Sequence, residues 1–103
     1  MVPRAKSRGF RTNFVYMIRC ADGTIYVGHT KNPEIREKEH NAGRGARYTA
    51  TRRPVRLVYR EALKSVNAAV RRELQLKRWS LAKKEALIAG DLERLKQLSR
   101  RPA

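Results

Sequence analysis

The fold of this chain is decided by the stretch FVYMIRCADGTIYVG, residues Phe14–Gly28. Two runs rich in β-branched and aromatic residues, Phe14–Arg19 and Thr24–Gly28, flank an Asp-Gly pair at positions 22–23. Asp-Gly between such runs is a strong hairpin signal because glycine tolerates a positive φ. The stretch therefore predicts a β-hairpin whose second strand ends at Gly28, just before a polar turn. A glycine there allows a backbone or a ligand to approach closely.

Further segments complete the predicted architecture. Val55–Glu61 is rich in β-forming residues and free of Gly and Pro, so it predicts a third strand. An isolated two-stranded hairpin is marginal in water, and the third strand gives it a partner. Helices are expected from Pro33 to about Ala42, after Ser65, from Ser80 to Ala89, and for a last amphipathic turn or two after Asp91. Their predicted N-caps are Asn32, Ser65, Ser80 and Asp91, and Gly90 is expected to close the helix that ends at Ala89. The expected fold class is α+β, a three-stranded antiparallel sheet flanked by α-helices.

The length and the charge of the chain limit its possible functions. Its 103 residues predict one domain at 14–90, preceded by a flexible basic arm at 1–13 and followed by a helical tail at 91–103. Lys and Arg number 25 against 9 Asp and Glu, a formal net charge of +16. Such an excess attracts polyanions, so nucleic acid is the expected partner. A ribosomal or general RNA-coating protein is the alternative that charge alone leaves open.

Cysteine usage and hydropathy bear on the compartment. The single cysteine, Cys20, excludes an internal disulfide and a cysteine-based zinc site, which fits a reducing compartment. No apolar run approaches the roughly 18 residues that a membrane span requires, and no apolar signal-peptide segment follows the start. The expectation is a soluble, cytoplasmic protein with no membrane partner.

The first predicted helix and the loop after it carry candidate site residues. Arg36 and His40 are four residues apart and so share one helix face, although a solvated charge and a surface histidine are the ordinary alternatives. The loop at 41–54 holds two glycines, no acid, and five residues suited to nucleic acid: Arg44, Arg47, Tyr48, Arg52 and Arg53. Arginine forks suit phosphate, and a tyrosine ring can stack on a base or a sugar. Loops of this length are usually functional or disordered, and the arginine content favours a substrate-gripping role.

A carboxylate lies within the apolar stripe of the helix after Ser65. The stripe consists of Val66, Ala69, Val70, Leu74 and Leu76, and Glu73 projects between Ala69 and Val70 in angle. Burying a charge there is costly unless the group is paired or binds a cation. Lys77, one turn further on, would make Glu73 an ordinary salt bridge. A bound metal ion is the functional alternative.

Two short motifs carry a family resemblance. Phe14-Val15-Tyr16, followed about ten residues later by Tyr26-Val27-Gly28, resembles the paired motif that names the GIY-YIG nucleases. In that family an Arg lies eight residues after the second motif's Gly, with a His or Tyr one turn later, and these positions are Arg36 and His40 here. The loop at 41–54 is also similar to that of the small single-domain bacterial branch.

The resemblance implies a general base for phosphodiester hydrolysis. Tyr16 is the expected base and Tyr26 its hydrogen-bond partner, although both rings could instead be strand packing residues. Tyrosine has a pKa near 10, so Tyr16 needs nearby cations, Arg36 and a metal ion, to lower that pKa. His40 is a competing base because its ordinary pKa already suits proton transfer near neutrality.

The resemblance also implies groups for the phosphate and a metal. Arg36 would clamp the scissile phosphate, and Glu73 would hold one Mg²⁺ or Mn²⁺ ion, since the family's metal-binding Glu lies on the helix after the third strand. Gly28 and His29 are expected to face nucleic acid, with His29 standing where many relatives carry Lys. Glu37 occupies a position that is usually apolar, which predicts loose packing of its helix.

The predicted function is that of a divalent-metal-dependent endonuclease hydrolysing DNA, with repair or recombination as the expected setting. A non-catalytic module that binds DNA or structured RNA and retains the fold is the main alternative. A ribosome-associated protein is a third, and it would prefer RNA and be indifferent to metal ions.

Overall fold

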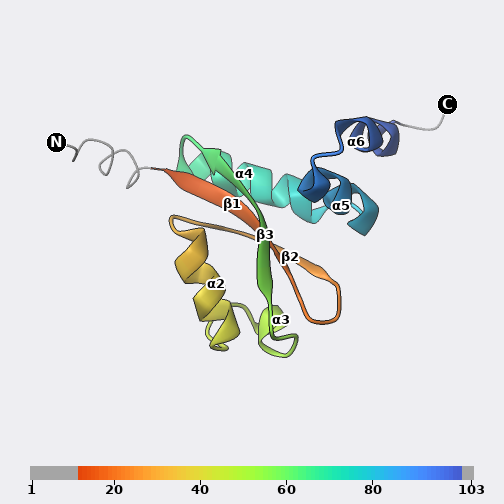
Figure 1. Ribbon diagram of the computed structural model, residues 1–103. Coiled ribbons are helices and arrows are strands. Elements are labelled where there is room, and N and C mark those ends of the chain that lie inside the picture. Colours follow the sequence, from red (N-terminus) through yellow and green to blue (C-terminus); the bar gives the residue numbers. More distant parts are fainter. Residues whose placement is uncertain (1–11, 101–103) are drawn as a thin grey trace.

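A computed structural model describes residues 12–100 of this chain (Figure 1). The elements in chain order are β1 (Asn13–Arg19), β2 (Ile25–Thr30), α2 (Pro33–Asn41), α3 (Arg47–Ala50), β3 (Arg56–Leu63), α4 (Val66–Lys77), α5 (Leu81–Ala89) and α6 (Leu92–Ser99). The predicted α+β class with a three-stranded antiparallel sheet is confirmed. The basic arm predicted at 1–13 lies outside the described residues except for its last two, and so do residues 101–103 of the tail.

The central strand of the sheet is β1, in the order β2-β1-β3. The predicted hairpin joins β1 to β2 through Gly23 at φ +88°, with the N–H of Cys20 donating to the carbonyl of Thr24 at 2.8 Å. The prediction that the second strand ends at Gly28 is wrong, because β2 continues to Thr30. Its extra residues pair with the start of β1, and Gly28 lies within the strand, opposite Tyr16.

A β-bulge interrupts the pairing of β1 with β3. Met17 lies opposite Tyr59 and Ile18 opposite Leu57, so one extra residue of β3 falls between the two pairs. A carboxylate oxygen of Glu37 on α2 accepts a hydrogen bond of 2.8 Å from the backbone N–H of Leu57. The expectation that Glu37 loosens its helix is therefore wrong, since this carboxylate ties α2 to β3.

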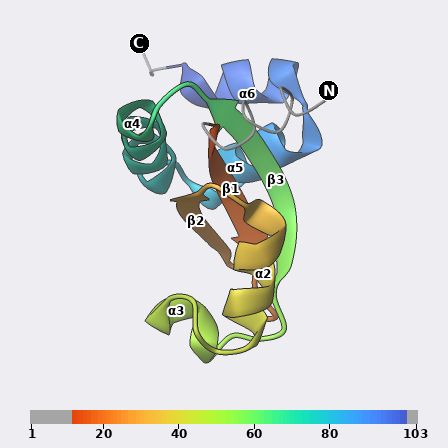
Figure 2. The same ribbon diagram turned by 90° about the vertical axis from the view of Figure 1, so that its left-hand side faces the viewer.

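The two faces of the sheet bury different residues. On the α4 face, Val15 and Met17 of β1 belong to an apolar cluster that also contains Ile25, Val27, Ala69 and Leu76. On the α2 face, Tyr16, Ile18 and Cys20 form a second cluster with Val55. Because side chains alternate along a strand, β1 contributes to both clusters and is buried on both sides. Figure 2 shows β1 enclosed among β2, β3 and the helices.

The helix boundaries follow the predicted caps. Side chains of Asn32, Ser65, Ser80 and Asp91 each accept a hydrogen bond from a backbone N–H in the first turn of α2, α4, α5 and α6 respectively. Gly90 ends α5 in the left-handed conformation, φ 70°. Within residues 12–100, none of these helices has the length and apolar character needed to cross a membrane.

The buried stripe of α4 is narrower than expected. Ala69 and Leu76 are fully buried, whereas Val66 and Leu74 are 49% and 55% exposed. The stripe is centred on Ala69 and Leu76, and at 100° per residue Leu74 turns away from that direction while Glu73 stays near it. The helix therefore places a carboxylate, and not Leu74, against the sheet.

Candidate active site

Three aromatic side chains meet on the α2 face of the hairpin. Tyr16 comes from β1, Tyr26 from β2 and His40 from α2. The ring centroids of Tyr16 and Tyr26 both lie within 6 Å of that of His40, at 5.9 and 5.3 Å. The two predicted tyrosines and the predicted histidine therefore occupy one cluster.

The hydroxyl of Tyr16 and the imidazole of His40 are directly hydrogen-bonded. The Tyr16 oxygen lies 2.9 Å from Nε2 of His40, and Nδ1 of His40 lies 2.7 Å from Oγ1 of Thr49. Tyr16 is 1% exposed, and His40 and Thr49 are 0% exposed. The sequence presented Tyr16 and His40 as rival bases, whereas the structure links them in one chain of hydrogen bonds. Thr49 was missed, because it lies in a loop with no periodic pattern to indicate that its side chain points inward.

Two glycines leave the space that these side chains occupy. A Cβ atom at Gly28 would lie 2.5 Å from the Tyr16 hydroxyl oxygen, and a Cβ at Gly45 would overlap the imidazole of His40. Any larger residue at either position would displace the hydroxyl or the ring. Gly28 was predicted to face nucleic acid, and the structure gives it a further role in accommodating Tyr16.

Burial determines the protonation states of Tyr16 and His40. It raises the pKa of Tyr16 to about 12, although a hydrogen bond from Arg36 acts in the opposite direction. Burial also lowers the pKa of His40, and the charge of Arg36 lowers it further. Near neutral pH the structure therefore holds a protonated tyrosine against a neutral imidazole. The sequence required nearby cations to lower the pKa of Tyr16, and the effect of burial exceeds that of Arg36.

Arg36 lies beside the hydroxyl of Tyr16. Its Nη1 donates a hydrogen bond of 2.8 Å to Glu39 one turn along α2. Hydrogen bonds to Glu39 and Tyr16 raise the pKa of Arg36, so the guanidinium stays charged. Its side chain is 33% exposed, which leaves part of the guanidinium open to a ligand. A fixed, partly exposed guanidinium beside a tyrosine hydroxyl can bind a phosphate.

Glu73 places a carboxylate on α4, on the other side of the sheet from Tyr16. The charge of Glu73 contributes to the raised pKa of Tyr16, although the two residues come from opposite faces of the sheet. The Glu73 side chain is 14% exposed, and its oxygens bind Nδ1 of His29 on β2 and Nζ of Lys77, the latter at 2.7 Å. Burial acts to raise the pKa of Glu73, but hydrogen bonds from Lys77 and His29 outweigh it, and the pKa is lowered. The carboxylate is therefore ionised and is held by two basic side chains. One of them, Lys77, makes the salt bridge that the sequence offered as the ordinary alternative.

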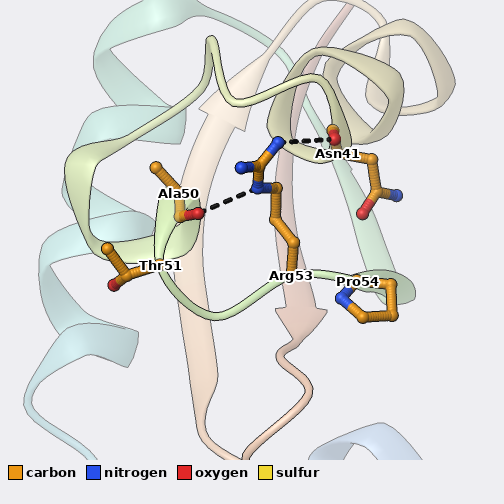
Figure 3. A pocket seen from close by; sticks show the side chains of 5 residues that line it. All are labelled: Asn41, Ala50, Thr51, Arg53 and Pro54. Carbon is orange, nitrogen blue, oxygen red and sulfur yellow. Dashed lines mark hydrogen bonds between the residues drawn. The ribbon is translucent and has the colours of Figure 1, made fainter.

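The loop arginines divide into two kinds. Arg53 is a clamp within the loop, since its Nε donates to the carbonyl of Ala50 at 2.8 Å and its Nη1 to the carbonyl of Asn41 at 3.2 Å (Figure 3). Arg52 donates to Asp22 at 3.1 Å and to the carbonyl of Tyr48 at 2.8 Å. Both residues were predicted to grip nucleic acid, and both already hold the loop.

The side chains of Arg44 and Arg47 are exposed and have no hydrogen-bond or ion-pair partner within residues 12–100. Tyr48 is 39% exposed, with Arg52 over its ring at 3.8 Å and the ring of Tyr26 stacked near it at 6.1 Å. Arg44 and Arg47 are therefore the loop side chains best placed to reach a phosphate. Tyr48 extends the aromatic cluster from Tyr26 to the protein surface.

Comparisons with known proteins point to one family. The family model described as the GIY-YIG catalytic domain matches residues 12–86. A UPF0213 protein of Natronomonas pharaonis is 49% identical over 79 residues, which cover 77% of this chain and 93% of that protein. A UPF0213 protein of Staphylococcus haemolyticus is 47% identical over 76 residues, covering 74% and 93%. The solution NMR structure of a UPF0213 protein from Bacillus halodurans is similar with a TM-score of 0.50 at 39% identity, covering 87% of this chain and 99% of that one.

Proposed function

Because this chain belongs to the GIY-YIG family, we propose that it is a divalent-metal-dependent endonuclease that hydrolyses phosphodiester bonds in DNA, in repair or recombination. One observation carries the proposal. The buried hydroxyl of Tyr16 is hydrogen-bonded to His40 and lies within electrostatic reach of both Arg36 and Glu73. A module that only binds nucleic acid gains nothing from burying a tyrosine hydroxyl against a neutral imidazole and beside a guanidinium.

Tyr16 and His40 act together as the base. With a pKa of about 12, Tyr16 is protonated near neutrality and can take a proton from water only as it gives up its own. The acceptor is Nε2 of His40, 2.9 Å away, whose lowered pKa keeps it neutral. The water oxygen bonds to phosphorus, the bond from phosphorus to the 3′ oxygen breaks, and the departing oxygen takes a proton from solvent. Two coupled groups thus supply a base that neither provides alone.

Arg36 binds the scissile phosphate. Its charge is fixed, and the planar guanidinium suits two phosphate oxygens at once, which a lysine does not. Negative charge builds on those oxygens as water attacks, so the interaction strengthens in the transition state and lowers the barrier. Arg36 therefore contributes to rate more than to affinity.

The residues present fit a single hydrated Mg²⁺ or Mn²⁺ ion. Glu73 offers an ionised, partly buried carboxylate whose oxygens bind the side chains of His29 and Lys77, basic groups that a metal ion can replace. No group of three or more His, Cys, Asp or Glu side chains suited to a metal forms within residues 12–100, so Glu73 would be the protein ligand. Mg²⁺ is commonly held by one or two carboxylates plus waters and substrate phosphate. When bound, such an ion would neutralise charge on the phosphate oxygens and the departing oxygen.

Cleavage of plasmid and branched DNA tests the proposal directly. We expect cleavage with Mg²⁺ or Mn²⁺ and none with a chelator, and we expect Glu73→Gln to keep DNA affinity but lose cleavage. Glu61→Gln is the matched control, because Glu61 is also a partly buried, ion-paired carboxylate, bound to Arg72. Cleavage by Glu73→Gln at the wild-type rate would remove the metal assignment. Tight DNA or RNA binding by the wild type without cleavage would favour the non-catalytic module.

A further inference from the structure

Thr49 is a buried polar residue for which the proposed chemistry has so far given no role. It lies in α3, a helix of four residues within the loop at 41–54. Its hydroxyl contacts two acceptor-capable atoms, Nδ1 of His40 at 2.7 Å and the carbonyl oxygen of Ala46 at 3.0 Å. These two hydrogen bonds explain why the Thr49 hydroxyl is buried although most of α3 is exposed.

We propose that Thr49 is a positioning residue that fixes His40 in the tautomer with hydrogen on Nδ1, leaving Nε2 free to accept the proton of Tyr16. This inference rests on the proposed nuclease function, because it names the residue that prepares the base of that reaction. The proton path is then Tyr16 O–H to His40 Nε2, with Thr49 holding the opposite side of the ring.

Counting hydrogens selects this tautomer. The Thr49 hydroxyl has one hydrogen, which it donates to the carbonyl of Ala46, so its oxygen can accept from Nδ1–H of His40. Nε2 then carries a lone pair, and the Tyr16 hydroxyl donates to it. The Tyr16 oxygen keeps its lone pairs free toward the neighbouring guanidinium of Arg36. The hydroxyl and ring donors from Tyr16 to Thr49 then all have acceptors, and only the backbone N–H of Ala46 loses its long contact with Nδ1.

The other tautomer leaves the hydroxyl hydrogen of Tyr16 unpaired. With hydrogen on Nε2, Tyr16 would become the acceptor, and its own hydrogen would find no acceptor among residues 12–100. Thr49 would donate to Nδ1, and the carbonyl of Ala46 would lose this hydrogen bond and keep the one from the backbone N–H of Ala50, at 3.1 Å. The only contact that this arrangement gains is the backbone N–H of Ala46, 3.4 Å from Nδ1 and at the long limit of hydrogen bonding. Leaving the buried Tyr16 hydroxyl hydrogen unpaired costs more than this long contact returns, so the first tautomer is favoured.

The loop is built to hold Thr49 in this place. Gly45 leaves room for the ring of His40. Arg53 binds the carbonyls of Ala50 and Asn41, and so connects the end of α3 to the end of α2, the helix that carries His40. Figure 3 shows this clamp closing the loop beside Thr51 and Pro54. These contacts explain why arginines predicted to grip a phosphate point into the loop.

The proton transfer from Tyr16 to His40 leaves every hydrogen of the relay accounted for when Thr49 is included. As the bond between oxygen and hydrogen in Tyr16 breaks, a bond between Nε2 and hydrogen forms, and the imidazole becomes a cation with hydrogen on both nitrogens. Thr49 accepts from Nδ1–H before and after the transfer, so no group has to turn. When the products leave, Nε2 returns its proton through Tyr16 to solvent, and the starting tautomer is restored.

The test is nitrogen NMR of the His40 ring in the full chain with ¹⁵N-labelled histidine, combined with single-turnover cleavage. In the wild type we expect hydrogen on Nδ1 and a lone pair on Nε2. Thr49→Val removes the acceptor and should shift the ring toward hydrogen on Nε2, with cleavage falling about 10- to 100-fold, the loss seen when a residue that orients a metal-binding histidine is removed. Thr49→Ser keeps the hydroxyl and should restore both. Thr51→Val, at an exposed position in the same loop, should change neither.

The tautomer separates this inference from the function on which it rests. Hydrogen on Nε2 in the wild type would overturn the role of Thr49 whatever the cleavage rate, and this measurement needs no variant to fold. Retention of hydrogen on Nδ1 in a folded Thr49→Val protein would overturn it as well. Absence of cleavage in the wild type would refute the nuclease proposal, while the tautomer would still show whether Thr49 orients the ring.

Discussion

The two faces of strand β1 differ in what they bury. On the α4 face, Val15 and Met17 pack against apolar side chains of β2 and α4. On the α2 face, Tyr16 between them is hydrogen-bonded to a buried histidine. Adjacent residues of one strand thus serve opposite purposes, because successive side chains point to opposite faces. The packing of Met17 and the hydrogen bonding of Tyr16 can therefore be altered separately.

The largest expected effect comes from the α4 face. Met17→Ala empties a fully buried position and should cost about 2–5 kcal/mol in the free energy of unfolding, measured by urea denaturation. Cleavage per folded molecule should be unchanged, because Met17 does not contact the site. Met17→Leu is the control and should cost less than about 1.5 kcal/mol. A loss of cleavage in folded Met17→Ala protein would show that the two faces are coupled.

The next effect comes from the α2 face. Tyr16→Phe should reduce single-turnover cleavage by roughly a hundredfold or more, as expected for a lost general base. Because Tyr16 and His40 form one relay, His40→Gln should cost a similar factor and the double variant little more than either single one. Tyr59→Phe is the matched control, since burial likewise raises the pKa of Tyr59 to about 12, but on the α4 face. Additive losses in the double variant would mean that the two residues act independently.

A smaller effect should appear in the dependence of stability on pH. His40 is buried in its neutral form with a pKa below its ordinary 6.5, so the unfolded chain binds a proton more readily than the folded one. Stability should therefore fall as the pH drops below about 6.5, by up to roughly 1.4 kcal/mol per pH unit, until the folded pKa is reached. His40→Gln should lose this contribution, whereas Met17→Leu should keep it. The free energies of unfolding would be measured by urea denaturation over roughly pH 5 to 7, the range in which histidine titrates. An equal pH dependence for the wild type and His40→Gln would contradict a buried neutral His40.

The smallest effect should come from residues that belong to neither face. Arg44→Ala with Arg47→Ala removes two exposed loop charges and should flatten the slope of log affinity against log salt by roughly 1.8, from about 0.9 per phosphate contact on duplex DNA. Cleavage at saturating protein should hardly change. Arg94→Ala with Lys96→Ala removes the same charge from α6 and is the control. Equal slopes for both double variants would mean that net charge, and not the loop, determines binding.

Local signals predicted most of the fold. The Asp-Gly turn, the caps at Asn32 and Ser65 and the glycine at 90 act on their own neighbours in the chain, so the sequence shows them directly. The sequence did not reveal α3, because four residues are too few for a helical period. It also ended β2 too early at Gly28, since the pairing that extends the strand comes from the start of β1.

The sequence named most of the candidate site residues but not the hydrogen bonds between them. Spacing and family resemblance selected Tyr16, Arg36, His40 and Glu73, and the roles of these residues stay predictions. The contacts of Thr49 with His40 and of Glu37 with Leu57 span 9 and 20 residues, and no periodicity relates such pairs. Arg52 and Arg53 were predicted to bind nucleic acid because the loop is rich in arginine. Composition cannot distinguish a free guanidinium from one that binds carbonyl groups of its own loop.

The outer strands of the sheet differ in a way that bears on solubility. On β3, the Glu37 carboxylate occupies the backbone N–H of Leu57, whereas the outer side of β2 pairs with no strand within residues 12–100. An open strand edge can add a strand from another molecule, and like charge is a common safeguard. The net charge of +16 provides it until nucleic acid neutralises that charge. Self-association should therefore begin near charge balance with DNA and reverse with excess DNA, which light scattering during a DNA titration would detect.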